Sequence, residues 1–204
     1  MSDFPTPVME IEKIKPKIQT LIDDFKANYS KYKQGSEADT ETKLIEPLFE
    51  ALGWLKSDYN KRESARRGDK RGIADYAFKI GDRIVFFLEV KKVGISLEKE
   101  ADKQVISYAL SKRIPFAVST NFEELKIFCV EQQDALTQTF RIFTKPEDYV
   151  NDIQNLLFLS KEYFEKNLTL QKAEDEKRLK KRMSIDKVLL EDLIQMRKLI
   201  VDVT

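Results

Sequence analysis

Residues 73–91, IADYAFKIGDRIVFFLEVK, hold the pattern that decides the fold of this chain. Two apolar runs lie on either side of Gly81-Asp82, a pair that favours a turn. The sequence therefore predicts strands at about 73–80 and 83–91, joined as a hairpin. Each strand carries one acid inside its apolar run, Asp75 in the first and Glu89 in the second. Because an unpaired buried charge is costly, both acids need a partner.

The connection between the two strands decides whether the acids meet. A plain two-residue turn would place Asp75 opposite Leu88, whereas a three-residue or bulged connection would place it opposite Glu89. Lys91 shares a face with Glu89, because side chains alternate along a strand. A site shared by the two acids therefore predicts the bulged connection or an equivalent slip in register.

Two explanations fit this acidic cluster. Carboxylates that converge at the end of a sheet repel one another unless a cation lies among them, and oxygen ligands select Mg²⁺ or a similar ion. Such a site fits metal-assisted hydrolysis of a phosphodiester, with Lys91 orienting the attacking water or stabilising charge on the phosphate. Alternatively, Lys91 forms a buried ion pair with Glu89 or Asp75 on an edge strand. Because 35% of the residues are charged, the residues alone favour neither explanation.

Composition narrows the classes of function. The 204-residue chain has a formal net charge of +1, so any nucleic-acid binding would depend on local basic patches. It contains no histidine, which excludes Ser-His-Asp and Cys-His catalysis and histidine metal sites. Its single cysteine, Cys129, lies in an apolar run and is expected to be reduced and buried. The apolar runs are too short to cross a bilayer and no signal peptide is visible, so we expect a soluble, cytoplasmic protein.

Helices and further strands are predicted around the hairpin. The spacing of apolar residues predicts helices at about 8–33, with a bend or break at Pro16, and at about 37–52 and 97–112. Further strands are predicted at about 54–60, 115–119, 125–130 and 139–143. This order of elements indicates an α/β fold with a mixed central sheet flanked by helices.

Residues 61–72, KRESARRGDKRG, are predicted to form a polar loop. Its basic side chains are candidates for contact with DNA phosphates, and a merely solvated loop explains them equally well. The candidates are Arg66, Arg67, Lys70 and Arg71.

The chain beyond Pro146 is predicted to be helical, with segments at about 147–160, 161–182 and 185–200. The last segment has an apolar stripe that must pack against another part of the protein. It is therefore expected either to connect to a further domain or to fold back on the core. The expected organisation is an N-terminal helix at 1–35, a core at 36–145 and a C-terminal helical extension at 146–204.

Several of these residues together resemble the PD-(D/E)XK nuclease superfamily. The motif consists of Asp75, then Glu89-Val90-Lys91 at a strand end, then Gln104 and Tyr108 on the following predicted helix. The opening helix is similar to that of N-terminal nuclease domains of restriction enzymes, through SEADT at 36–40, LIEPL at 44–48 and ALGW at 51–54. The resemblance covers about residues 36–130. One departure is Ala74, which stands where the superfamily motif has proline.

The resemblance implies a restriction-endonuclease-like fold and a Mg²⁺-dependent DNA endonuclease, with Mn²⁺ as an alternative ion. Asp75 and Glu89 would be the metal ligands and Lys91 the catalytic lysine. Glu37 would be the helix acid that completes the site, with Glu41 less favoured. The remaining motif residues would lie near the site, with a catalytic role for Gln104 and a DNA contact for Tyr108.

Two kinds of restriction enzyme fit this resemblance. Residues 189–199 are similar to the connector that leads into the methyltransferase of type IIG enzymes, which favours that type over a type I subunit with an ATP-driven translocase. S-adenosylmethionine would then bind only to the attached methyltransferase. The partners implied are double-stranded DNA, linked methyltransferase and target-recognition domains, and a transient dimer on DNA. Alternatives are a non-catalytic DNA-binding or docking module on the same fold, and a helical interaction protein whose acids are structural.

Overall fold

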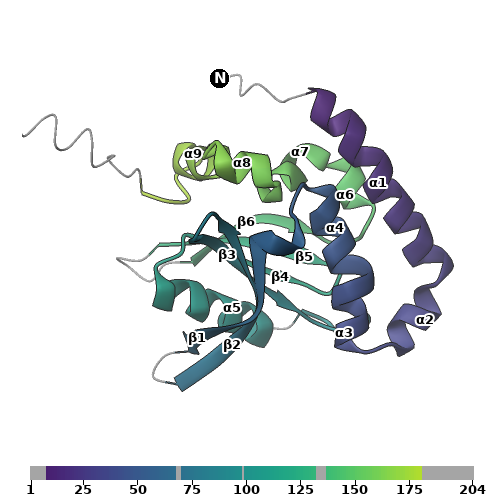
Figure 1. The fold of residues 1–204 in the computed structure, drawn as a ribbon, viewed down its shortest axis with the longest axis horizontal. Coiled ribbons are helices and arrows are strands. Elements are labelled where there is room, and N and C mark those ends of the chain that lie inside the picture. The colour runs from purple at the N-terminus through teal and green to yellow at the C-terminus, as the bar shows by residue number, and fades with distance from the viewer. Residues whose placement is uncertain (1–7, 68–69, 98, 132–136, 181–204) are drawn as a thin grey trace, which may run out of the picture.

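A mixed sheet of six strands forms the centre of the computed structural model, which describes residues 8–67, 70–97, 99–131 and 137–180 (Figure 1). The strands are β1 (Tyr59–Arg67), β2 (Lys70–Ile80), β3 (Arg83–Val90), β4 (Phe116–Thr120), β5 (Leu125–Val130) and β6 (Thr137–Phe143). They follow one another across the sheet in chain order. β3 and β4 are parallel and joined through the helix α5 (Lys99–Lys112), whereas the other neighbours are antiparallel. The predicted α/β fold with a mixed sheet is confirmed.

Both faces of the sheet are covered, which explains why β3 is almost continuously apolar. Phe86 and Leu88 point into a large core beneath the N-terminal and C-terminal helices. Phe87 points to the opposite face, where it packs with Val105 and Tyr108 of α5. Figure 1 shows α5 on one side of the sheet, and α1 (Val8–Ala27) and α4 (Glu46–Ala51) on the other. None of the described helices combines the length and apolar character needed to cross a bilayer.

The β2–β3 hairpin contains the predicted slip in register. Ile80 pairs with Arg83, so the turn at Gly81-Asp82 has two residues. The register then shifts between Phe78 and Lys79, where β3 holds one extra residue. Beyond the shift, Phe78 pairs with Phe86 and Tyr76 with Leu88. Continuing this register by one residue places Asp75 opposite Glu89, through a bulge inside the hairpin instead of a longer turn.

The helix predicted at about 37–52 is confirmed, with a change of winding in its middle. It runs through α3 (Glu37–Thr40), the π-helical η1 (Glu41–Ile45) and α4. Ser36 and Asp39 form a capping box at its start, since the N–H of each donates to the side chain of the other. Pro47 has no N–H to donate to the preceding turn, which fits the wider π turn there. The helix is followed by Gly53, whose φ of 91° lies in the left-handed region.

The edge strand predicted at about 54–60 exists but begins at Tyr59 and runs on to Arg67, and the loop predicted at 61–72 is wrong for the described residues. A short 3-10 turn, η2 (Lys56–Asp58), precedes β1, which pairs with β2 as far as Arg67↔Lys70. Of the residues predicted as a loop, 61–67 belong to β1 and 70–72 to β2. β1 is an edge strand, where polar side chains face solvent, so its composition is similar to that of a loop.

The helices outside the core are divided differently from the prediction. α1 runs through Pro16 and is followed, after Asn28, by α2 (Tyr29–Gln34), so of the bend or break predicted at Pro16 the break does not occur. Residues 147–180 hold α6 (Asp148–Asn151), α7 (Ile153–Leu156), η3 (Leu157–Leu159), α8 (Lys161–Glu165) and α9 (Leu168–Asp175). Asn167, with a φ of 57°, separates the last two. The helix predicted at 185–200 and its role as a connector lie outside the described residues. Cys129 is a buried free thiol, as predicted.

The first testable prediction concerns the core under the hairpin. Trp54 is buried, its Nε1–H donates to the Leu159 carbonyl at 2.7 Å, and its ring centroid lies 5.1 Å from that of Phe78. Trp54→Ala is expected to lower the free energy of unfolding by about 3–5 kcal/mol, measured by urea denaturation. The control is Leu55→Ala, because Leu55 is 60% exposed and its loss should cost less than about 0.5 kcal/mol. Equal losses in the two variants would contradict the assignment of Trp54 to the core.

Candidate active site

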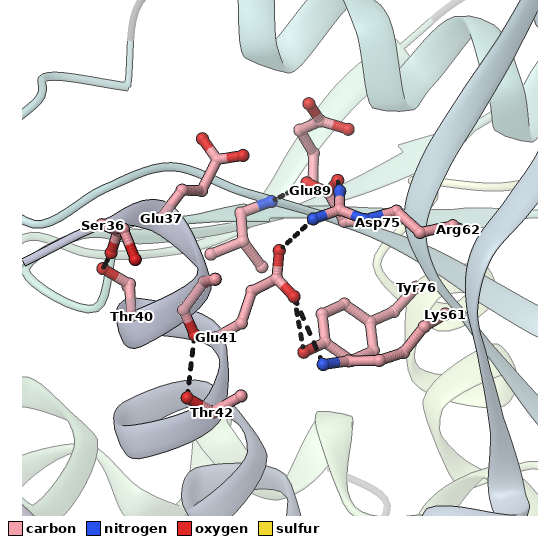
Figure 2. A network of polar contacts seen from close by, with 12 residues as sticks. Ser36, Glu37, Thr40, Glu41, Thr42, Lys61, Arg62, Asp75, Tyr76 and Glu89 are labelled. Atoms are coloured by element: carbon pink, nitrogen blue, oxygen red, sulfur yellow. Dashed lines mark hydrogen bonds and ion pairs between the residues drawn. The ribbon is translucent and has the colours of Figure 1, made fainter.

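Four acids lie near the open end of the β2–β3 hairpin, and Figure 2 shows Glu37, Glu41, Asp75 and Glu89 in one neighbourhood. The slip in register brings Asp75 of β2 opposite Glu89 of β3, and the opening helix supplies Glu37 and Glu41 from successive turns. One carboxylate oxygen from each of Glu37, Glu41 and Asp75 lies within 4.8 Å of the others. Hard oxygen ligands at such spacing suit a divalent cation.

Asp75 is buried and both of its oxygens are engaged. Oδ2 accepts a hydrogen bond of 2.8 Å from the backbone N–H of Val90, and Oδ1 pairs with the Arg62 guanidinium. Burial raises the pKa of Asp75, while the Val90 N–H and Arg62 act in the opposite direction. Asp75 is therefore a charged group that depends on its partners to remain ionised.

Glu89 is buried more completely and is only half satisfied. Its Oε1 accepts from Lys91 Nζ at 2.7 Å and from Gln104 Nε2 at 2.8 Å. Its Oε2 is buried and has no hydrogen-bond partner among the residues that the structure describes. Burial raises the pKa of Glu89 to about 7, and the neighbouring Asp75 carboxylate acts in the same direction. A cation beside Oε2 would satisfy this oxygen and favour its charged form.

Lys91 lies between two acids. Its Nζ is 2.7 Å from Glu89 Oε1 and 3.9 Å from Glu37 Oε2. Its backbone N–H donates to the Thr120 carbonyl at 2.8 Å, which fixes its position at the end of β3. Burial opposes the charged form, but the hydrogen bond and the charge of Glu89 raise the pKa of Lys91. Lys91 is thus a fixed positive charge at the edge of the acidic cluster.

The structure places both helix acids in the site. Glu37 is partly exposed and approaches Lys91, while Glu41 is buried beneath Arg62. Glu41 Oε1 accepts from Arg62 Nη2 at 2.8 Å, and Oε2 accepts from the Tyr76 hydroxyl at 3.3 Å. The resemblance favoured Glu37 over Glu41 as the acid that completes the site. In the structure, each of them has a carboxylate oxygen within 4.8 Å of one from Asp75.

The two motif residues of α5 have different positions. Gln104 points into the site and donates to Glu89, as its predicted role requires. Tyr108 is 2% exposed and packs edge-on against Phe87, with ring centroids 6.4 Å apart. A Cβ at Gly72 would lie 2.6 Å from the Tyr108 ring, so this glycine lets β2 approach α5. Tyr108 therefore lies in the core in this structure, and its contact with DNA stays a prediction.

The basic residues of the β1–β2 hairpin contribute to the site in a way that the sequence did not indicate. The backbones of Arg66, Arg67, Lys70 and Arg71 lie at the far end of the hairpin, and their side chains are outside the described part of the structure. Arg62 and Lys61, by contrast, reach the acids from β1. Both were assigned to a polar loop, because the edge strand was predicted to end at about residue 60.

Comparison with known proteins finds a relative in sequence. No protein-family model matches the chain. The chain is 31% identical, over 167 residues, to the Type II restriction enzyme and methyltransferase RM.Eco57I of Escherichia coli. This alignment covers 70% of the chain and 17% of that protein, so the chain spans about a sixth of the length of its relative. The match supports a relationship to restriction enzymes.

Among solved structures, the chain is similar to a protein chain in a cryoEM structure of a DrdV–DNA complex. The TM-score is 0.47 and the sequence identity 12%, over 72% of this chain and 13% of that one.

The second testable prediction follows from the raised pKa of Glu89. The folded protein binds the proton of the Glu89 carboxyl more tightly than the unfolded chain does. The free energy of unfolding therefore falls as the pH rises from about 4.5 to about 7 and Glu89 ionises. In EDTA, the stability of Glu89→Gln relative to the original chain should therefore increase between pH 5 and pH 8, by at most about 3 kcal/mol. Urea denaturation at each pH measures it. Asp82→Asn, at the exposed turn of the same hairpin, is the control, and a difference that does not change with pH would contradict the prediction.

Proposed function

We propose that this chain is the nuclease part of a restriction enzyme and hydrolyses phosphodiester bonds of DNA with the help of a divalent metal ion. The observation that carries the proposal is the pair of buried acids, Asp75 and Glu89, brought together by the slip in register, with Lys91 two residues beyond. The similarity of most of the chain to a type II restriction enzyme and methyltransferase supports the same function. Together these findings favour a nuclease of the PD-(D/E)XK kind.

The residues of the site fit a divalent cation. Glu37, Glu41 and Asp75 each place one carboxylate oxygen within 4.8 Å of the others. Glu89 is not part of this group, but its buried Oε2 has no hydrogen-bond partner in the described structure and could accept a cation beside it. This donor set suits Mg²⁺, and Mn²⁺ as an alternative. When bound, the ion would supply Lewis-acid polarisation of the phosphate and a lowered pKa for the attacking water.

The residues of the chain itself have separate roles in this proposal. Lys91, held in place by Glu89, provides a fixed positive charge that stabilises the negative charge developing on the phosphate or orients the attacking water. Gln104 holds Glu89 by its hydrogen bond and so acts as a positioning residue. The backbone N–H of Val90 fixes the Asp75 carboxylate in the same way.

A type IIG enzyme is the best candidate for the whole protein. The relative is named as both a restriction enzyme and a methyltransferase, and this chain matches 17% of its length. In a type IIG enzyme, linked methyltransferase and target-recognition domains would bind S-adenosylmethionine and read the DNA sequence in the cytoplasm. Cleavage of both strands would then require two nuclease sites, and so a transient dimer on double-stranded DNA. The alternatives are a type I subunit and a non-catalytic docking module on the same fold. Cleavage assays separate an active nuclease from the docking module.

The third testable prediction is the loss of DNA cleavage in two variants. Asp75→Asn and Lys91→Ala are each expected to lower the rate of Mg²⁺-dependent cleavage of plasmid DNA at least about 100-fold, because the first removes the charge of a metal ligand and the second removes the positive charge that acts on the reacting phosphate. Conversion of supercoiled plasmid to nicked and linear forms on a gel measures the rate.

The matched control for these variants is Asp82→Asn, which removes an exposed acid from the turn of the same hairpin and should cleave normally. Undiminished cleavage by Asp75→Asn would disprove the assignment of this site. Absence of cleavage by the original chain, together with no binding of Mn²⁺, would favour the docking module.

A further inference from the structure

Arg62 has an unusual backbone conformation in the middle of β1. Its φ is 55°, in the left-handed region that is costly for any residue with a Cβ. The pairs on either side, Lys61↔Tyr76 and Glu63↔Ala74, keep one register, so no extra residue accompanies this conformation. Asp75 lies between Tyr76 and Ala74 on the facing strand. The strained residue is therefore the one that stands opposite a proposed metal ligand, and strain of this kind gathers at functional sites.

The Arg62 guanidinium lies between two acids of the site (Figure 2). It pairs with Asp75 Oδ1, and its Nη2 donates to Glu41 Oε1 at 2.8 Å. Asp75 and Glu41 belong to the group of carboxylates that suits a cation. Arg62 thus supplies, from the chain itself, the positive charge that this cluster needs.

The exposure of these side chains shows that Arg62 can leave without disturbing the core. The Arg62 side chain is 53% exposed, whereas those of Glu41 and Asp75 are 4% and 6% exposed. A long, solvent-facing side chain covers two buried acids. Rotation of that side chain towards solvent would expose the acids while the strand stays paired.

The neighbouring basic residue, Lys61, contacts different atoms. Lys61 Nζ lies 2.7 Å from Glu46 Oε1 and 3.4 Å from Glu41 Oε2, and it stands over the Tyr76 ring at 5.1 Å from the centroid. Lys61 thus contacts the Oε2 atom of Glu41 and does not contact Asp75. Lys61 raises the local positive potential as Arg62 does, but it does not occupy the same oxygens.

We propose that Arg62 is an exchangeable internal counter-ion of the active site. While it holds Asp75 Oδ1 and Glu41 Oε1, those oxygens are engaged, and Arg62 must leave them before they can bind a divalent cation. This inference rests on the proposed metal-dependent function. It predicts that the metal-free site is kept closed and stable by Arg62, and that every metal ion bound there must displace it.

The displaced guanidinium would be exposed beside the site, where a phosphate of bound DNA can accept two of its N–H groups. A phosphate that captures Arg62 offsets the cost of displacing it. DNA should therefore increase the affinity for metal, and metal the affinity for DNA, by the same factor. Arg62 would in this way couple the two binding events.

The test is a calorimetric titration with Mn²⁺ of the original chain and of Arg62→Gln. Without its competitor, the site in Arg62→Gln should bind Mn²⁺ roughly tenfold more tightly, the effect expected from one charge-assisted contact. Lys61→Gln is the matched control, because it removes the same charge from the neighbouring residue, and its affinity should change less than about threefold. Addition of a short duplex in EDTA-free buffer should then raise the Mn²⁺ affinity of the original chain and leave that of Arg62→Gln nearly unchanged.

Asp75→Asn separates failure of this inference from failure of the proposed function. If Mn²⁺ binding is lost in Asp75→Asn but Arg62→Gln binds no more tightly than the original chain, Arg62 is not a counter-ion and the metal site stands. An equal gain in Lys61→Gln would also overturn the inference, since it would show a general effect of charge. If Asp75→Asn binds Mn²⁺ normally, the metal does not use this site and both proposals fail.

Thermal unfolding provides a second measurement that does not depend on activity. Arg62→Gln should unfold at a lower temperature than the original chain in EDTA and show the larger rise in Tm on addition of Mn²⁺. If Arg62→Gln does not fold, Arg62→Lys keeps a charge that cannot bridge two carboxylates with a planar fork, and its affinity should be intermediate. A Tm rise in either variant no larger than that of the original chain would contradict the inference.

Discussion

The site depends on one extra residue in β3, opposite the shift between Phe78 and Lys79. Because side chains alternate along a strand, a slip of one residue decides which pairs face each other across the whole of the remaining hairpin. With the slip, Asp75 meets Glu89 and lies close enough to bond the Val90 N–H. The same register sends Phe86 into one core and Phe87 into the other, so the packing of both faces maintains the alignment of the acids.

A buried acidic cluster of this kind is stable only because the protein surrounds it with its own positive charges and N–H groups. Lys91 contacts Glu89, Arg62 bridges Glu41 and Asp75, and one oxygen of Glu89 has no partner in the described structure. A fold optimised for stability alone would not leave a buried carboxylate half satisfied. The raised pKa values of Asp75 and Glu89 have the same origin, because burial disfavours the charged forms that a metal ion would stabilise.

The sequence predicted the elements that face the core and missed those whose conformation depends on contacts distant in sequence. The hairpin at 73–91 was predictable from its apolar runs and its Gly81-Asp82 turn, and the spacing of apolar residues predicted the helix that carries Glu37 and Glu41. β1 was predicted too early in the chain and too short, because an edge strand keeps polar residues on its exposed side. The position of the bulge could not be predicted, because tertiary packing selects it. Tyr108 shows the same limit, since its burial depends on Gly72 of a different strand.

β1 is the strand whose side chains contact the acids of the candidate site. β1 presents Lys61 and Arg62 to acids of the helix and of β2, so the edge of the sheet neutralises the site from the solvent side. A counter-ion supplied by the core would be fixed, whereas one supplied by a solvent-facing side chain can be exchanged for another cation. In the proposed mechanism this arrangement stabilises the metal-free protein, and a phosphate group that captures Arg62 favours binding of a metal ion to the acids. An edge strand that looks like a loop in sequence is therefore well suited to this role, because its polar residues are free to change partners while its backbone remains paired.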